Sequence, residues 1–294
     1  MSTNHAIALA SREDNASYWD TTITKHGNKY WRRLQEPSLA RLLGPSLSSK
    51  PGGGRGGNKK ALDLATGNGL CARWLARHGA HSVLATDGTE NMLALARAHC
   101  SEDDDDDEPG STAGVKIGFR KVDVTSAGDL EKLGREEGRF DVVLMNMAVM
   151  DVADLEPLAR ALRGLLADGG VFVATLLHPV FFTSNATRNF NVGYSPVNGE
   201  YEVVRSKVIT EYMSVLPAVG IALPGQPVKQ IYFHRPMHEL FATFFKAGLV
   251  MDAMEELAFT EEDAEEKIES NSNYTQLPAI LAFRMRFPSG TTRV

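Results

Sequence analysis

A short apolar run that breaks into a glycine turn constrains this chain more than any other feature. Residues 62–70 read LDLATGNGL, in which Asp63 interrupts the apolar run shortly before Gly67 and Gly69. Glycine lets the backbone turn sharply and approach a ligand with no side chain between them. A strand, a glycine turn and a helix in this order are typical of a cradle for a nucleotide. The sequence therefore predicts a nucleotide-type ligand here, with Asn68 able to adopt a left-handed backbone.

Strands and helices alternate regularly after this turn. We expect strands at residues 60–66, 82–87, 115–124, 140–146 and 171–177, and helices at residues 70–78, 90–99, 129–134 and 155–166. Such alternation predicts a parallel, doubly wound α/β sheet. A further helix begins at Pro236, and strands at 249–259 and 278–287 follow with no helix between them. We expect these two strands to pair antiparallel.

Four parts follow from this pattern: an N-terminal helical cap with a linker (1–59), a ligand-binding core (60–178), an insertion (179–233) and a segment that completes the sheet (234–294). We expect residues 1–14 to be a frayed end, and helices after them to be interrupted at Pro37 and to end near Gly44. The aromatic cap either covers the site or is plain core. Residues 48–60 are rich in glycine and lysine and predict a flexible linker. The insertion, with a strand pair at 201–213, predicts a lid or substrate wall.

Charge and composition exclude several classes of protein. The net charge is −6, but residues 102–108 are an unbroken acidic run, without which the chain is nearly neutral. A nucleic-acid binder usually shows a basic face, so none is expected. No apolar run approaches the ~20 residues of a membrane span, and the N-terminus does not resemble a secretory signal. Two cysteines give no disulfide framework or metal spacing, which favours a cytoplasmic protein without a metal.

Polar side chains stand where the expected strands end. Asp87 follows the second strand and is placed to accept hydrogen bonds from both ribose hydroxyls, although it also fits the N-cap of the next helix. Asp123 ends the third strand, where it either accepts from an adenine amino group, beside the Val124 amide, or makes a turn. Asn146 ends the fourth strand, at the edge where such sheets bind ligands.

The glycine turn alone fits a nicotinamide dinucleotide as well as it fits other nucleotides. Asp63 at the strand end would repel a pyrophosphate, whereas it favours a ligand with a cationic amino-acid part. The reversed final strand pair is also not needed by a plain dinucleotide domain. These two features favour S-adenosyl-L-methionine.

The motifs LDLATGNG, TDGTENML, FDVVLMNMAVMDV, LRGLLADGGVFVATLLHPVF and YFHRPMHELFATFFKAGL resemble those of the class I S-adenosylmethionine-dependent methyltransferases, over residues 61–287. The resemblance implies a Rossmann-like sheet of seven strands with the last strand antiparallel. The family usually has glycine where this chain has Ala65. The Asn-Pro-Pro-aromatic motif of amino-directed DNA methyltransferases is missing, which disfavours a nucleobase target. The implied cofactor contacts are Asp63, Ala65, Gly67, Asn68, Gly69, Asp87, Gly88, Met92, Asp123, Val124, Asn146 and Met147.

Methyl transfer from a sulfonium needs a positioned acceptor, exclusion of water and, for some acceptors, removal of a proton. His178 follows the fifth strand and is the candidate base or acceptor-orienting residue, although a structural histidine before Pro179 fits the same place. Met147 and Met150 fit either a contact with the ligand or the hydrophobic core. His234 also fits a structural role in which it braces the next helix. The side chains expected to surround an acceptor are Tyr18, Tyr30, Trp31, Met150, Phe181, Phe182 and His234.

The sequence thus predicts methyl transfer to O, N or S of a small, partly apolar metabolite by a monomer or homodimer. The alternatives are a cofactor-binding protein that does not methylate (a regulatory protein or a sulfonium-assisted cyclase) and an NAD(P)-dependent oxidoreductase.

Overall fold

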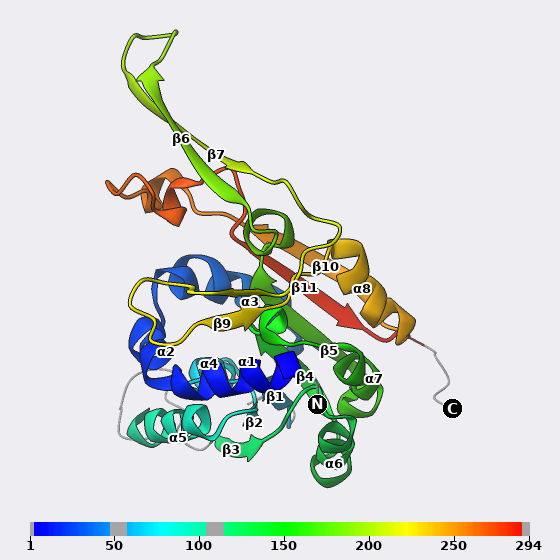
Figure 1. The fold of residues 1–294 in the computed structure, drawn as a ribbon. Coiled ribbons are helices and arrows are strands. Elements are labelled where there is room, and N and C mark those ends of the chain that lie inside the picture. The colour runs from blue at the N-terminus through cyan, green and yellow to red at the C-terminus, as the bar shows by residue number, and fades with distance from the viewer. Residues whose placement is uncertain (1–2, 48–57, 104–114, 290–294) are drawn as a thin grey trace.

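The computed structural model describes residues 3–47, 58–103 and 115–289. Most of the predicted linker and residues 104–108 of the acidic run lie outside these residues. Within them a seven-stranded sheet has the order β10-β11-β5-β4-β1-β2-β3 (Figure 1). Its strands are β1 Lys60–Leu64, β2 Ser82–Asp87, β3 Lys116–Lys121, β4 Phe140–Asn146, β5 Leu166–Leu177, β10 Val250–Leu257 and β11 Ile280–Arg286.

The predicted fold class is confirmed, including the antiparallel pairing of the last two strands. Strands β1 to β5 pair parallel, and β11 pairs antiparallel with both of its neighbours, β5 and β10. The reversed strand therefore lies inside the sheet, and β10 forms the edge. A hairpin of two adjacent strands places the second one next to β5, which a reading of chain order alone does not reveal.

Successive residues of the central strands contribute side chains to two separate hydrophobic cores, one on each face of the sheet. In β4, Val142 and Leu144 pack with α3 and α4, while Val143 and Met145 pack with α6, α7 and α8. Side chains alternate across a strand, and both faces of this sheet are covered, so the strand reads as a continuous apolar run. The helices are α3 Glu36–Leu47, α4 Leu70–Arg77, α5 Glu90–Asp103, α6 Ala127–Glu137, α7 Glu156–Leu165 and α8 Met237–Lys246.

The N-terminus is helical, contrary to the expected frayed end. Helix α1 (Thr3–Asp14) is followed by α2 (Ala16–Ile23), and α1 lies across the sheet edge near β9 (Figure 1). Its buried positions His5, Ala8 and Ser11, together with Asn15 just after the helix, recur every three or four residues. That is helical spacing, but three of the four side chains are polar. An apolar pattern therefore does not reveal the helix.

Pro37 does not interrupt the helix as expected. A π-helical turn, η1 (Trp31–Gln35), leads directly into α3, which continues past Pro37 and Pro45 to Leu47. The N–H of Glu36 bonds to the carbonyl of Trp31. This wider turn comes just before a proline that has no N–H to donate, so the backbone passes the ring without a break.

The insertion contains two strand pairs with different surroundings. Strands β6 (Thr187–Tyr194) and β7 (Tyr201–Val208) form a hairpin that projects away from the sheet (Figure 1). The predicted pair at 201–213 was therefore misplaced, because its first strand lies upstream. Strands β8 (Ala218–Gly220) and β9 (Gln230–Tyr232) form the second pair, and β9 contacts α1. Short helical turns complete the fold: η2 Val149–Asp151, η3 Pro179–Thr183, η4 Glu261–Asp263 and η5 Asn271–Asn273.

In the described ranges, the helices are all too short or too polar to cross a bilayer.

Candidate functional site

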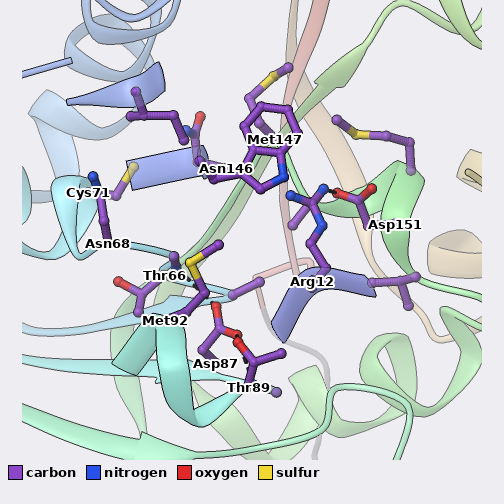
Figure 2. A pocket seen from close by; sticks show the side chains of 18 of the residues that line it. Arg12, Thr66, Asn68, Cys71, Asp87, Thr89, Met92, Asn146, Met147 and Asp151 are labelled. Carbon is purple, nitrogen blue, oxygen red and sulfur yellow. Dashed lines mark hydrogen bonds and ion pairs between the residues drawn. The ribbon is translucent and has the colours of Figure 1, made fainter. Parts of the chain in front are cut away.

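A cavity of about 340 Å³ lies at the carboxyl ends of β1, β2, β3 and β4, with α1, α2 and η1 contributing to its wall (Figure 2). This is the edge at which open parallel sheets bind ligands. Of the twelve residues proposed for the cofactor, the following line it: Asp63, Ala65, Gly67, Asn68, Asp87, Gly88, Met92, Asp123, Val124, Asn146 and Met147. Their roles as cofactor contacts stay predictions.

Gly69 does not line the cavity, and there is a structural reason for glycine at this position. Its φ is +79°, and a Cβ there would lie 3.0 Å from the Cβ of Ala96 on α5. The residue therefore permits both the left-handed entry into α4 and the close contact between α4 and α5. Ala65 also has a left-handed backbone, with φ of +53°. This is the position where the resembled family has glycine.

Asp63 is a buried carboxyl at the end of β1. It is 1% exposed and accepts a hydrogen bond from the hydroxyl of Thr66. Burial, with a smaller contribution from the nearby charge of Asp87, raises its pKa to about 7, against the lowering effect of the Thr66 hydrogen bond. A cationic ligand in the cavity would favour the ionised form of this group.

Asp87 ties the end of β2 to the glycine turn. Its Oδ2 accepts from the Gly67 N–H at 3.0 Å, and its Oδ1 accepts from the N–H and the hydroxyl of Thr89 at 3.0 and 2.8 Å. Burial raises the pKa of Asp87. A carboxylate has about four acceptor positions, so capacity remains for a ligand hydroxyl. The local turn and a ribose contact are compatible.

Asp123 is engaged by the cap. The Nε2 of His5 lies 2.9 and 3.1 Å from its two oxygens, and the N–H and hydroxyl of Thr125 donate to Oδ1. The contact with His5 joins α1 to the loop after β3. Hydrogen bonds from Thr125 and His5 hold the pKa of Asp123 below its ordinary value even though burial raises it.

A second link from α1 crosses the cavity. The guanidinium of Arg12 forms an ion pair with Asp151, which follows β4 (Figure 2). Burial raises the pKa of Asp151 in spite of this cation. Among the described residues that line the cavity, the only basic side chains are His5 and Arg12, whereas the acidic ones are Asp20, Asp63, Asp87, Asp123 and Asp151. The cavity therefore favours a cationic ligand over an anionic one.

The residues predicted to surround an acceptor divide into two groups. Tyr30, Trp31, Met150 and Phe182 line the cavity. Tyr18, Phe181 and His234 are not among its lining residues. The Tyr18 hydroxyl donates to the Pro224 carbonyl, and Phe181 packs against His178.

His234 has both of its ring nitrogens engaged. Its Nε2 lies 2.7 Å from the carbonyl of Tyr212, and its Nδ1 lies 2.9 Å from the hydroxyl of Thr183. His234 therefore braces the segment before α8, which is the second of the two roles that its sequence position allowed.

The geometry contradicts a catalytic role for His178. The side chain is buried and is not among the lining residues. Its Nδ1 accepts from the Val180 N–H, and its Nε2 lies 2.8 Å from Glu256. Burial lowers its pKa. A neutral ring with both nitrogens engaged has no lone pair to offer an acceptor. His178 is a structural histidine at the start of η3.

Sequence reasoning missed several lining residues, most of them on the cap. No motif marks them, because helix α1 buries mainly polar side chains. The missed polar and aromatic residues are His5, Arg12, Trp19, Asp20, Asn28, Gln35, Thr66, Thr89, Asp151, Tyr232 and Asn271. Asp151 had the clearest signal, since it follows Met150 directly beyond the β4 strand end.

A doubly wound sheet with one reversed strand, a glycine turn and acidic side chains at successive strand ends defines a nucleotide-cofactor-binding α/β protein of the methyltransferase type. Residues 62–174 match the family described as a methyltransferase domain. Over these residues the chain is similar to methyltransferases, and its fold is that of the S-adenosylmethionine-dependent methyltransferases.

Similar proteins agree with this family. A ubiquinone biosynthesis O-methyltransferase from Marinobacter nauticus is 32% identical over 119 residues, covering 40% of this chain and 44% of the relative. A protein of the same name from Acinetobacter baumannii is 32% identical over 154 residues, which cover 50% of this chain and 57% of the relative. The chain thus spans about half the length of these curated relatives. An S-adenosylmethionine dependent methyltransferase from Mesorhizobium loti shares the fold, with a TM-score of 0.59, 23% identity, and coverage of 90% of this chain and 100% of that one.

Proposed function

We propose that this protein transfers a methyl group from S-adenosylmethionine to a small, partly apolar acceptor. The observation that carries the proposal is the excess of carboxylates in a cavity at the carboxyl ends of four parallel strands. S-adenosylmethionine has a net positive charge from its sulfonium and ammonium groups. The pyrophosphate of a nicotinamide dinucleotide has the opposite sign and would be repelled.

The cofactor supplies an electrophilic methyl group on a sulfonium, with a neutral thioether as the leaving group. The chain's own residues bind and orient. Asp87 accepts from a ribose hydroxyl, and Asp63 attracts the ammonium of the amino-acid part. The cap helices cover the cavity and exclude water. The cavity wall holds the acceptor in line with the methyl group.

The cavity wall supports an acceptor with an apolar ring or chain. Tyr30 and Trp31 from the cap and Phe182 from η3 offer aromatic surface at one wall. The curated relatives are named as O-methyltransferases, which favours a hydroxyl oxygen as the methyl acceptor. The nearly neutral body of the chain supports a small molecule over a nucleic acid. We further propose a cytoplasmic monomer or homodimer, in which residues 3–47 act as the cap.

Calorimetric titration with S-adenosylhomocysteine, S-adenosylmethionine and NAD⁺ tests the cofactor. We expect the first two to bind and NAD⁺ not to bind. Asp87→Asn should weaken S-adenosylhomocysteine by about tenfold or more, because a charge-assisted hydrogen bond to ribose is lost. Asp154→Asn, at an exposed position outside the cavity, is the matched control. Binding of NAD⁺ alone would overturn the proposal.

A screen of phenols, catechols and other small hydroxyl, amine and thiol compounds tests the reaction. Release of S-adenosylhomocysteine together with a methylated product supports methyl transfer. Tight cofactor binding with no transfer to any acceptor would favour a regulatory member of the fold. Cofactor-dependent rearrangement without a methylated product would favour a sulfonium-assisted cyclase.

A further inference from the structure

A chain of hydrogen bonds with a fixed direction runs from β5 to the cavity wall. The Met147 N–H donates to Oγ1 of Thr175 at 2.9 Å, in the pair of strands where Asn146 lies opposite Thr175. Since this oxygen already accepts there, its own hydrogen is available for the Oδ1 of Asn146, at 2.6 Å. The hydroxyl therefore determines which end of the Asn146 amide is oxygen and which is nitrogen.

The direction continues to the cap. The Nδ2 of Asn146 donates to Oε1 of Gln35 at 2.9 Å. Gln35 thus presents its Nε2, which is a donor only. Gln35 lines the cavity and is 7% exposed, and its Nε2 has no hydrogen bond within residues 3–47, 58–103 and 115–289. Because Gln35 lines the cavity and no described residue accepts from its Nε2, this donor is open to a ligand that supplies an acceptor.

The position of Gln35 identifies that acceptor. The Cys71 thiol, just after the glycine turn, interacts both with Asn146 and with Asp63. Gln35 therefore lies at the Asp63 end of the cavity. Figure 2 shows Asn146 on the same side as Cys71 and Asn68, away from Arg12 and Asp151. The predicted adenine contact Asp123 lies just after β3, which is two strands away from β1.

Opposite charges are therefore complemented at one end of the cavity. Asp63 offers a carboxyl to a cation, and Gln35 offers an amide donor to an oxygen. The amino-acid part of S-adenosylmethionine has an ammonium and a carboxylate on one carbon atom. An amide donor is suited to the carboxylate, because hydrogen bonds to a charged acceptor are the stronger ones.

We propose that Gln35 donates a hydrogen bond to the carboxylate of the cofactor's amino-acid part, and that Thr175 and Asn146 act as positioning residues that fix the direction of the Gln35 amide. This deepens the proposed function and rests on it. The relay makes the site selective for ligands that retain the carboxylate.

Two ligands separate this contact from the rest of the site. S-adenosylhomocysteine has the amino-acid part, whereas 5′-methylthioadenosine has the same nucleoside and sulfur without it. Calorimetric titration of Gln35→Glu and Gln35→Met should show a loss of about tenfold or more for S-adenosylhomocysteine and little change for 5′-methylthioadenosine. Gln276→Glu makes the same change as the first variant at an exposed position and should alter neither affinity.

Thr175→Val tests the relay without touching a ligand. It keeps the shape of the side chain but removes the hydroxyl, so it should lower the affinity ratio of S-adenosylhomocysteine to 5′-methylthioadenosine. A purely structural role would weaken both ligands together and leave that ratio unchanged. Thermal unfolding of each variant shows whether it has folded.

The outcomes are distinct. An unchanged ratio in all Gln35 variants overturns the inference. A raised KM for the acceptor with unchanged S-adenosylhomocysteine affinity would also overturn it and assign the Gln35 amide to an acceptor oxygen. If the unaltered protein binds neither nucleoside, the proposed function itself fails, independently of Gln35.

Discussion

Asp63→Asn should stabilise the ligand-free protein at neutral and alkaline pH. The folded state raises the pKa of Asp63 to about 7, chiefly through burial, whereas an exposed aspartate titrates near 4. A raised carboxyl pKa means that the folded state holds its proton more tightly than the unfolded state. The stability from this proton is fully present below pH ~4 and is lost progressively as the pH rises to about 7. Asparagine has no proton to lose and keeps a similar shape.

The size of the effect follows from the pH interval. Each unit between the two pKa values corresponds to about 1.4 kcal/mol, and the slope flattens as the pH reaches the folded-state pKa, so the loss between pH 5 and pH 7 is about 2 kcal/mol. The difference in free energy of unfolding between Asp63→Asn and the unaltered protein should rise by about that amount over the same interval. Urea unfolding at pH 5, 6, 7 and 8 measures it, with Asp154→Asn as the exposed control.

Other carboxyls also titrate with folding, so the test is the difference between the two proteins and not the profile of either one. Free energies that run parallel from pH 5 to pH 8 would refute a buried, protonated Asp63. A profile that diverges, together with weaker S-adenosylhomocysteine binding by the variant, would agree with a site whose free form is destabilised by the group that attracts the ammonium.

Three further predictions concern the cap, the glycine turn and the histidine. Arg12→Met should lower the free energy of unfolding by about 2 kcal/mol, because Asp151 loses its cation, and a second change, Asp151→Asn, should recover part of it in urea titrations. Gly69→Ala should cost about 1–3 kcal/mol, through its φ of +79° and the contact with Ala96, whereas Gly164→Ala in α7 meets no atom within 4 Å and should be neutral or stabilising by thermal unfolding. His178→Gln should change kcat by less than the ~100-fold loss expected for a catalytic base, and a loss of that size with unchanged stability would restore the catalytic assignment.

The core of the fold was predictable because its determinants are local. Gly67 and Gly69 mark a turn whose backbone conformation favours glycine, and the apolar runs on either side of it have strand length. Asp87, Asp123 and Asn146 end successive parallel strands, and parallel strands bring their carboxyl ends to one edge. Spacing along the chain was therefore enough to place these side chains around one cavity.

The cap was not predictable in the same way, because its determinants are contacts with distant residues. His5 and Arg12 are held by Asp123 and Asp151, more than one hundred positions away. Their helix shows no apolar periodicity. Gln35 was hidden for a related reason, since its significance depends on a hydrogen bond from Asn146 across the fold.

His178 illustrates the opposite error. Its place after β5, at the edge of the crevice, suggested chemistry. Sequence position fixes the backbone's location but not the direction of the side chain, and this ring turns to Glu256 on β10. The hairpin β6–β7 was misplaced because Asn189, Asn191 and Gly193, residue types that are depleted in strands, stand between the alternating apolar side chains of its first strand.

The pairing of His5 with Asp123 has a consequence for affinity. The cap supplies an internal competitor for a carboxylate that the adenine amino group would use. If the amino group takes the position that His5 occupies, binding through Asp123 requires a molecule in which His5 has withdrawn. The apparent dissociation constant equals the intrinsic one divided by the fraction of such molecules, so a protein with the pair open about one-tenth of the time binds about tenfold more weakly than its contacts allow. The same competition lets His5 reoccupy Asp123 as the product leaves, so the cap that lowers affinity also favours release of the spent cofactor.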